Sequence, residues 1–507
     1  MGSIILINKQ VDYTSSKITQ IVKKLTNSKK AGHSGTLDPL ASGLLIIATD
    51  EKTKELEKLL NLDKTYVCEI KFGEHTETYD REGKILNKSN NFPTLENVEK
   101  QIIFFKESKY FQEVPIYSSV KIKGKKLYEY ARANEEVELP IKEVKIKNIN
   151  LLNFNESSKT ITLELNVSKG FYVRSFAVDF ARKLDCYAHI HSLHRTKIGN
   201  YKIEDALTSF DELWKYHTKV SIITRDFEFI SSKENLIIGQ FDILHCGQEK
   251  ILNEKNYNAL IFINNPSKNY YSNSVLNRIL NLSEFNPNKI YVYDIGAKNS
   301  NITGHDFNSN YLRKINPFKI IIGENFKYGC DKRDVNFLAD NFHCEIIPVE
   351  KKCSSTYIRE LLLKGEIIFA NSLFLKRFKI QGIVIHGTKK GKTLNFPTLN
   401  VEWKTNIGMK SGSYSSITKI DKKFYESTTL VWETKNNIVL TETFVHSFDK
   451  YSYGKFIEVW PIKYINELVK LDNDLSLAIK IKNEVQKSIE IHEFFFKKIV
   501  KEIIKIG

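Results

Sequence analysis

The sequence predicts a multidomain chain that combines α+β and α/β architecture in three successive domains. Its 507 residues are too many for one hydrophobic core. The apolar pattern changes twice along the chain, from mixed strands and helices, to apolar runs alternating with helices, to many short strands. A hydrophobic fraction of 41% with 12% aromatic residues is enough for packed cores and excludes a disordered chain.

The first domain is expected over residues 1–218 and has an α+β pattern. Short apolar segments of strand character alternate there with segments of helical periodicity. Strands are expected at 4–8, 65–72 and 161–167, and helices at 15–25, 95–105 and 174–184.

The second domain is expected over residues 219–365 and opens with an apolar strand, 236–239, that runs into a loop. Further apolar runs at 259–264, 290–294 and 320–323 each lie near a helical segment. This alternation is typical of a parallel, doubly wound sheet.

The third domain is expected over residues 366–507. Its many short strands and turn residues predict a small β-barrel, followed by amphipathic helices over 474–506.

Composition limits the environment and the partners. The formal net charge of +16 favours a polyanionic partner such as nucleic acid or nucleotide phosphates. The six cysteines show neither a C-x-x-C pair nor metal-ligand spacing, so we expect reduced structural thiols and no zinc site. No apolar stretch is long enough to cross a bilayer, so a soluble, cytoplasmic protein without a membrane partner or an evident obligate protein partner is expected.

One stretch of the first domain carries a candidate catalytic carboxylate. Residues 30–43 read K-A-G-H-S-G-T-L-D-P-L-A-S-G, so Asp38 stands in a glycine-bounded turn before an apolar strand. Pro39 biases Asp38 away from helical dihedrals, and the glycines permit close approach of a ligand. Taken alone, Asp38 is a nucleophile, a general base or a solvated turn residue.

Other segments of the domain supply groups that can converge on Asp38. Tyr66 begins a strand and can stack on a planar substrate, although a core position is the ordinary alternative. Arg174 opens a helix and can hold a carboxylate ionised, or it is a surface charge. The basic and aromatic run 117–128 can contact RNA phosphates or form a solvated face.

These residues lie in six segments, in order, that together resemble the TruB family of tRNA pseudouridine synthases along nearly the whole first domain. The segments are 8–24, 30–43, 64–83, 115–132, 168–182 and 193–199.

The resemblance implies a pseudouridine synthase domain with a mixed sheet and a role for five residues. Asp38 is then the nucleophile, Tyr66 stacks on the target base, and Arg174 ion-pairs with Asp38. His33 contacts the flipped-out nucleotide, and Tyr172 lines the pocket. The implied reaction is isomerisation of the T-loop uridine, position 55, of tRNA without a cofactor.

The second domain contains a candidate phosphate-binding turn. Residues 238–248 read I-G-Q-F-D-I-L-H-C-G-Q, a strand followed by a Gly-x-Phe-Asp turn and a histidine at the mouth of a helix. A Ser/Thr cluster with an arginine at 354–359 suits a leaving pyrophosphate. The alternative for each segment is an ordinary helix cap.

The second and third domains together resemble the bifunctional riboflavin kinase/FAD synthetases of the RibF family. For the Rossmann-like nucleotidyltransferase half, the expected nucleotide-binding residues are Gly239, Phe241, Asp242, His245, Gln248, Asn325, Ser355, Thr356 and Arg359. In the kinase half, 391–400 read G-K-T-L-N-F-P-T-L-N, which implies that Thr398 and Asn400 hold Mg²⁺ with ATP. Glu442 is the implied general base on riboflavin, with FMN and then FAD as products.

Four positions depart from the pattern of that family. Ile243 replaces a glycine and Gln248 replaces a histidine in the phosphate turn, so crowding and a lost positive charge are expected there. In the kinase half, Phe444 replaces a histidine, and Asn466 replaces an arginine that begins a helical segment.

Two functions of other classes remain open from sequence. A TruB-like domain with a dead pocket would act as an RNA-folding chaperone, which retention of Asp38, Tyr66 and Arg174 argues against. The later domains would alternatively bind flavin or ATP as a regulator without turning them over.

Overall fold

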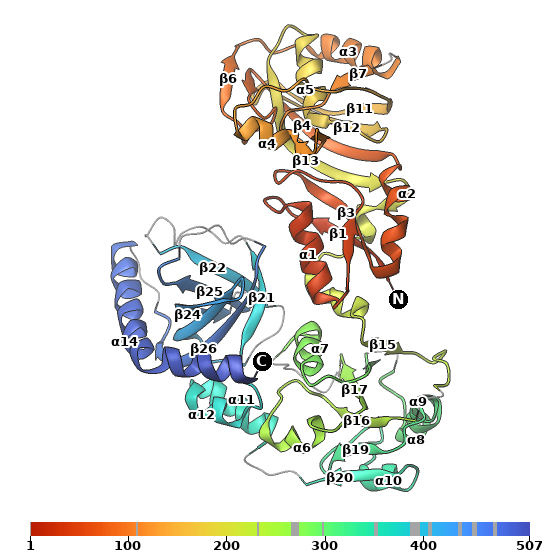
Figure 1. Cartoon of the computed structure of the whole chain (residues 1–507), viewed down its shortest axis with the longest axis vertical. Coiled ribbons are helices and arrows are strands. Elements are labelled where there is room, and N and C mark those ends of the chain that lie inside the picture. The colour runs from red at the N-terminus through yellow and green to blue at the C-terminus, as the bar shows by residue number, and fades with distance from the viewer. Residues whose placement is uncertain are drawn as a thin grey trace. The chain divides into compact units, whose positions relative to one another are not determined.

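The chain forms two compact units in the computed structural model (Figure 1). The first unit comprises Met1–Lys24 and Ser28–Phe210, and the second comprises Leu25–Asn27 and Asp211–Gly507. No helix in the described part of the chain is long and apolar enough to cross a membrane. The described residues are 2–107, 110–230, 233–264, 273–296, 299–348, 353–385, 396–403, 408–433, 439–448, 454–469 and 474–506.

The first unit is built on an eight-stranded mixed sheet. Its strands follow the order β1-β3-β13-β4-β12-β11, with β2 paired to β3 and β14 paired to β13. Strands β3 and β13 are parallel, and their neighbours pair antiparallel. The bounds are β1 (Ile4–Lys9), β2 (Ala31–His33), β3 (Ser42–Thr49), β4 (Lys64–Phe72), β11 (Ile146–Asn155), β12 (Thr160–Val167), β13 (Ala188–Ile198) and β14 (Tyr201–Lys202).

Helices of the first unit cover the sheet where alternate strand residues are apolar. Phe105, Phe176 and Phe180 contact one another in one core cluster with residues of β4 and β12. The helices expected at 15–25, 95–105 and 174–184 are therefore present, with bounds that differ by at most two residues. They are α1 (Ser15–Leu25), α3 (Leu95–Glu107) and α5 (Val173–Arg182).

The second unit begins with a six-stranded parallel sheet of order β15-β18-β17-β16-β19-β20. From β16 the next strands in sequence run to one side, β17 and β18, and then to the other, β19 and β20. Such a reversal marks the edge at which doubly wound sheets bind ligands. The strands are β15 (Val220–Ile223), β16 (Asn235–Gly239), β17 (Tyr257–Ile263), β18 (Ile290–Asp294), β19 (Ile320–Gly323) and β20 (Cys344–Ile347).

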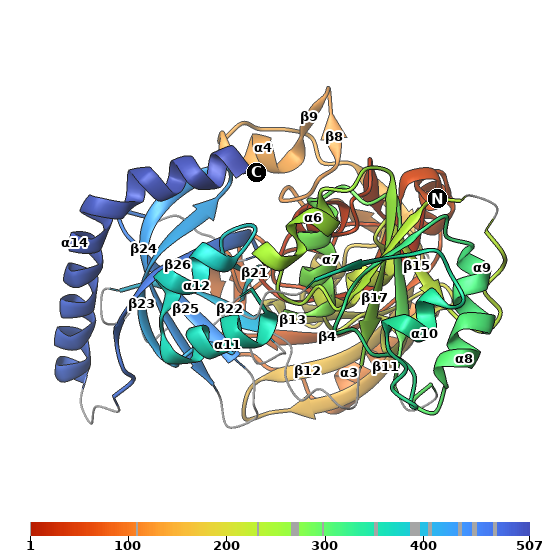
Figure 2. The same ribbon diagram turned by 90° about the horizontal axis from the view of Figure 1, so that it is seen from below.

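A closed six-stranded barrel of order β21-β22-β25-β24-β23-β26 completes the second unit. The amphipathic segment after it forms one continuous helix, α14 (Asp474–Ile506), which lies along the barrel beside β23 and β24 (Figure 2). The strands are β21 (Ile380–Ile385), β22 (Thr398–Trp403), β23 (Gly412–Ile420), β24 (Lys423–Glu433), β25 (Val439–Val445) and β26 (Phe456–Asn466).

The parallel-sheet half and the barrel share a hydrophobic core. Ile358 and Leu362 of α11 (Ser355–Lys364) and Ile367 of α12 (Ile367–Leu373) belong to the same buried cluster as Val384 and Tyr414 of the barrel. This cluster ties the two halves into a single unit.

Candidate active sites

Asp38 lies in the turn between β2 and β3, with its side chain 34% exposed. The turn is anchored by Ser15, whose hydroxyl accepts from the Leu37 amide (2.8 Å) and donates to the Leu37 carbonyl (3.1 Å). Gly43 has a φ of +106°, and a Cβ there would lie 2.3 Å from the Arg195 carbonyl oxygen. Only glycine therefore lets β3 approach β13 at this point.

Arg174 connects the Asp38 turn to two other loops. Its Nε lies 2.9 Å from Asp38 Oδ2, and its side chain is only 5% exposed. The remaining guanidinium nitrogens donate to the carbonyl oxygens of Thr78 and Tyr117, each at 2.9 Å. A second carboxylate, Asp80, lies 3.7 Å from the guanidinium. The arrangement keeps a positive charge fixed beside a partly exposed carboxylate.

The contacts of Arg174 include groups that the sequence analysis did not identify. Asp80 is 5% exposed, and its Oδ1 accepts from the Thr78 hydroxyl (2.6 Å) and the Glu82 amide (3.0 Å). Asp80 belongs to the segment 64–83, one of the six that carry the family resemblance, so its place in the sequence was an available clue. The carbonyl oxygens of Thr78 and Tyr117 could not be predicted as partners of Arg174 from residue identity, because every residue has a backbone carbonyl.

Tyr66 and Tyr172 lie on the elements that flank the turn. Tyr66 on β4 is 9% exposed and packs in the same core cluster as Leu37 and Leu40, which stand on either side of Asp38 in sequence. Tyr172 immediately precedes α5, and its amide and carbonyl both bond to the Gln112 side chain at 2.7 Å. Burial raises the pKa of Tyr172, and the negative charge of Asp38 raises it further.

Two polar groups, the half-buried His33 and the buried Lys9, lie near the same turn. His33 ends β2; burial and the charge of Arg195 lower its pKa, and its Nδ1 has no hydrogen-bond partner among the described residues. Lys9 is fully buried and donates to the Tyr13 carbonyl at 2.6 Å. Burial lowers the pKa of Lys9 to about 8, although Asp38 acts in the opposite direction. The charge of Lys9 thus acts on Asp38, and the lowered pKa of His33 favours its neutral imidazole.

The predicted phosphate turn follows β16 in the second unit. Gly239 ends the strand, and Phe241 adopts a φ of +47° with its ring against Gly239, where a Cβ would lie 2.9 Å from the ring. Asp242 is buried and pairs with Arg359 of α11 at 2.8 Å. Its other oxygen accepts from the Asn273 amide (2.9 Å). The structure therefore joins the turn to the helix that carries the Ser/Thr cluster.

Other expected nucleotide-binding residues lie close to that turn, with one exception. His245 is buried, and burial together with Arg359 lowers its pKa to about 4; the Gln248 side chain accepts from the His245 amide at 3.3 Å. Ser355 and Thr356 form the first turn of α11. Asn325 is exposed in the loop after β19, and no described contact brings it to the others.

The expectation of reduced thiols was wrong for two cysteines. Cys246 and Cys353 form a disulfide, with Cα atoms 5.8 Å apart despite a sequence separation of 107 residues. The other four, Cys68, Cys186, Cys330 and Cys344, are free. The pair escaped prediction because the turn and the residue before Ser354 meet only in the tertiary fold.

The residues expected to act in a kinase reaction share one face of the barrel. Asn400 on β22 pairs directly with Glu442 on β25, and Thr398 pairs with Phe444. Because side chains alternate along a strand, all four project to the same side. Burial raises the pKa of Glu442, partly offset by a hydrogen bond from Trp432. A carboxylate and two oxygen-bearing side chains are thereby adjacent. Residues 391–395 of the predicted ATP motif lie outside the described residues.

The departures from the family pattern have defined positions. Ile243 is 1% exposed and packs in the core cluster with Ile358, and Phe444 contacts the Phe396 ring at 5.3 Å. Asn466 is the last residue of β26, paired with Ser413, and does not begin a helix. The first helix after it starts at Asp474.

Comparisons with known proteins match two separate parts of the chain. Residues 23–173 match the TruB family pseudouridylate synthase (N terminal domain), and residues 375–492 match riboflavin kinase. The tRNA pseudouridine synthase B of Malacoplasma penetrans is 47% identical over 205 residues, which are 40% of this chain and 88% of that protein. That of Ureaplasma urealyticum is 44% identical over 219 residues, 43% of this chain and 95% of that protein. A solved structure titled macrolide-efflux protein from Streptococcus pneumoniae aligns with a TM-score of 0.46 at 21% identity, covering 53% of this chain and 98% of that one.

Proposed function

Since the chain belongs to the TruB family of pseudouridylate synthases and carries a riboflavin kinase domain behind it, we propose that it is a tRNA pseudouridine synthase fused to flavin-nucleotide enzymes. The first domain converts the T-loop uridine at position 55 of tRNA to pseudouridine in the cytoplasm. The barrel phosphorylates riboflavin to FMN, and the parallel-sheet domain adenylylates FMN to FAD.

The observation that carries the first activity is the ion pair, at 2.9 Å, between the buried Arg174 guanidinium and the partly exposed Asp38 carboxylate. A carboxylate must be ionised to attack a nucleoside, and a fixed guanidinium favours the ionised form. In this proposal Asp38 is the nucleophile. The glycosidic C1′–N1 bond breaks, C1′ bonds to C5 of the rotated base, C5 loses its proton and N1 gains one, so the product is an isomer and no cofactor is consumed.

Access to the uridine requires that the base leave the stacked tRNA loop. Extrusion costs a few kcal/mol, which contacts in the pocket must offset. Tyr66 supplies a stacking surface, and His33 and Tyr172 contact the flipped nucleotide. The positive charge of the chain supplies sequence-independent attraction for the phosphates of the T-arm.

Base-resolved pseudouridine mapping of tRNA incubated with the full chain tests this proposal. We expect modification at the T-loop uridine by the unmodified protein and none by Asp38→Asn, with tRNA binding retained. Asp63→Asn is a matched control, because Asp63 is 36% exposed and pairs with Lys147 on the surface. Pseudouridine formation by Asp38→Asn would refute the assignment.

For riboflavin phosphorylation, support comes from the pairing of Asn400 with Glu442. Glu442 acts as the general base on the riboflavin hydroxyl. The Thr398 hydroxyl and Asn400 amide oxygens are the hard donors that Mg²⁺ prefers, and their spacing puts both on one face, so the residues fit an Mg–ATP site. The ion would neutralise phosphate charge.

For FAD synthesis, support comes from the Asp242–Arg359 pair, which joins the turn after β16 to α11. The isoleucine that replaces the family's glycine at position 243 is buried in the core, away from solvent. Gln248 retains a polar side chain but carries no positive charge. Measuring FMN and FAD separately from riboflavin and Mg–ATP decides the matter: FMN without FAD would refute adenylylation and leave the kinase proposal intact.

A further inference from the structure

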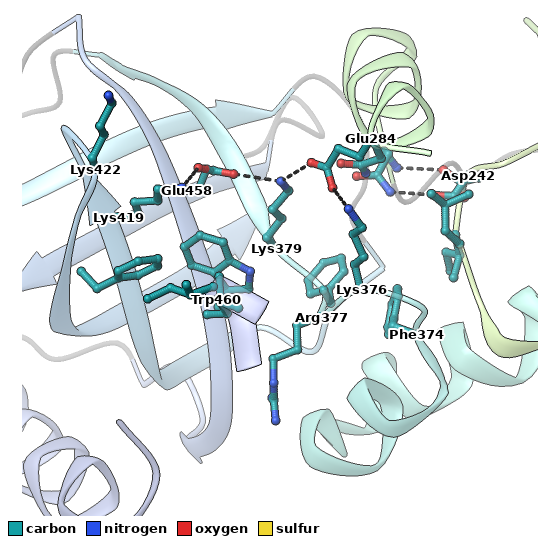
Figure 3. A pocket seen from close by; sticks show the side chains of 18 residues that line it. Asp242, Glu284, Phe374, Lys376, Arg377, Lys379, Lys419, Lys422, Glu458 and Trp460 are labelled. Carbon is teal, nitrogen blue, oxygen red and sulfur yellow. Dashed lines mark hydrogen bonds and ion pairs between the residues drawn. The ribbon is translucent and has the colours of Figure 1, made fainter. Parts of the chain in front are cut away.

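A cavity of about 690 Å³ lies inside the second unit, between its parallel-sheet half and the barrel (Figure 3). The turn Asp242–Leu244 and the end of α7 (Val275–Ser283) form one side. Residues 376–379 and strands β23, β24 and β26 form the other, with the end of α14. Its volume lies within the range of small-molecule sites, about 300 to 1,000 Å³.

Charged side chains line one side of the cavity in an alternating chain. Glu284 accepts from Lys376 (3.0 Å) and Lys379 (2.9 Å), and Glu458 accepts from Lys379 (2.8 Å) and lies 3.5 Å from Lys419. Figure 3 shows Lys379 between the two carboxylates. Lys379 is thus satisfied within the chain. The ammonium groups of Lys376 and Lys419 each pair with one of these carboxylates, which leaves N–H donors on both.

The lining has an excess of positive charge. Among the described residues, five lysine or arginine side chains line the cavity against three carboxylates. Lys422, in the exposed turn between β23 and β24, has no ion-pair partner in the described part of the chain. Two of these groups are paired outside the lining, since Asp242, which the cavity shares with the phosphate turn, pairs with Arg359 and Arg377 pairs with Glu502, which leaves four lysines against Glu284 and Glu458.

Aromatic side chains form the wall next to these cations. Phe424 and Trp460 contact each other with ring centroids 5.8 Å apart. Lys419 Nζ lies 5.5 Å from the centre of the Phe424 ring. Phe374 and Phe378 add further apolar surface from the segment after α12. An apolar aromatic wall beside lysines that keep N–H donors available suits a ligand with a flat ring and a phosphate.

We propose that this cavity binds a planar aromatic phosphate, with its ring against Phe424 and its phosphate near Lys419 and Lys422. Flavin mononucleotides and adenine mononucleotides share this chemistry. The site is separate from the kinase face, because Thr398, Asn400 and Glu442 do not line it. Of the residues assigned to the proposed FAD synthesis, only Asp242 lines the cavity, on the side opposite β23 and β24, so the ligand proposed beside Phe424, Lys419 and Lys422 is additional to the substrates of both proposed activities.

Tryptophan fluorescence of the full chain, titrated with FMN, tests the site. The Trp432→Phe background removes the tryptophan beside Glu442, and Trp460→Phe in the same background removes the one in the cavity wall. We expect FMN to quench emission from Trp460. In that background, Lys422→Glu should raise the FMN midpoint about tenfold, because a favourable surface charge becomes unfavourable. Lys423→Glu, the adjacent exposed lysine outside the cavity, should change it less than twofold.

Competition between FMN and AMP for the cavity distinguishes a flavin ligand from an adenine nucleotide. Displacement of FMN by AMP at comparable concentration assigns adenine nucleotides as well, and failure of AMP to displace FMN assigns the flavin. Equal midpoints for Lys422→Glu and Lys423→Glu would overturn the proposal, as would riboflavin or inorganic phosphate alone binding as tightly as FMN. The rate of FMN formation, measured on Lys422→Glu and Lys423→Glu in the otherwise unmodified chain, should be unchanged, so failure of this site is distinguishable from failure of the kinase proposal.

Discussion

Replacing Arg174 by lysine separates the charge of this residue from its geometry. Arginine donates from Nε to Asp38 and from its two other nitrogens to the carbonyls of Thr78 and Tyr117. A lysine keeps the positive charge but donates from one nitrogen and cannot reach acceptors on three sides of a planar fork.

The size of the effect follows from the contacts that are lost. Each partly buried acceptor left unpaired costs about 1 to 2 kcal/mol, so two of them cost about 2 to 4 kcal/mol. For a unit of this size that corresponds to a melting transition about 5 to 15 °C lower. A small displacement of Asp38 should reduce the rate of pseudouridine formation about a hundredfold.

Calorimetry of the full chain and single-turnover pseudouridine formation measure these two effects. Arg182→Lys is the control, because Arg182 lies on the same helix but is 73% exposed, and its one ion pair within the described ranges is with Asp179. A variant Arg174→Lys with the melting transition and rate of Arg182→Lys would refute the view that the three-loop contact positions Asp38.

Three further outcomes are expected. Glu442→Gln should abolish FMN formation and leave pseudouridine formation unchanged. Because burial raises the pKa of Glu442 and a general base must be ionised, the rate of FMN formation should begin to fall with decreasing pH at a pH above the usual glutamate pKa. A pH–rate profile that is flat in that range would contradict this. Gly43→Ala should destabilise the first unit by about 3 kcal/mol or more, whereas Gly170→Ala, with a φ of +79° and open space around it, should cost about 1 kcal/mol in calorimetry. Cys353→Ser should lower the melting transition of the second unit, since the disulfide closes a separation of 107 residues and contributes up to about 4 to 5 kcal/mol; a reductant should lower the transition of the parent chain and leave that of the variant unmoved.

The local pattern of apolar and polar residues was sufficient to predict strands and helices, and to predict that Thr398 and Asn400 share one face of a strand. The strands β18 and β19 have the bounds that the apolar runs at 290–294 and 320–323 predict. Likewise, the alternation of side chains along a strand puts Thr398 and Asn400 on one face. Their partner Glu442 follows from the register of β22 on β25, which no pattern within either strand specifies.

What could not be predicted depends on contacts between distant segments. The carbonyls of Thr78 and Tyr117 bind Arg174 through the backbone, so residue identity holds no trace of them. Spacing alone also gave no reason to pair Cys246 with Cys353. Asn466 ends a strand because its backbone pairs with Ser413, a tertiary contact that overrides any helical tendency of the segment.

The buried guanidinium of Arg174 also determines at which stage of folding the proposed active site of the first unit is complete. Its bonds to Thr78 and Tyr117 span 96 and 57 residues, and such contacts form only after the loops between them have closed. A partly folded chain can therefore attract RNA by charge while Asp38 still lacks its partner. Recovery of isomerisation should lag behind recovery of secondary structure on refolding, which makes catalysis a late reporter of a complete fold.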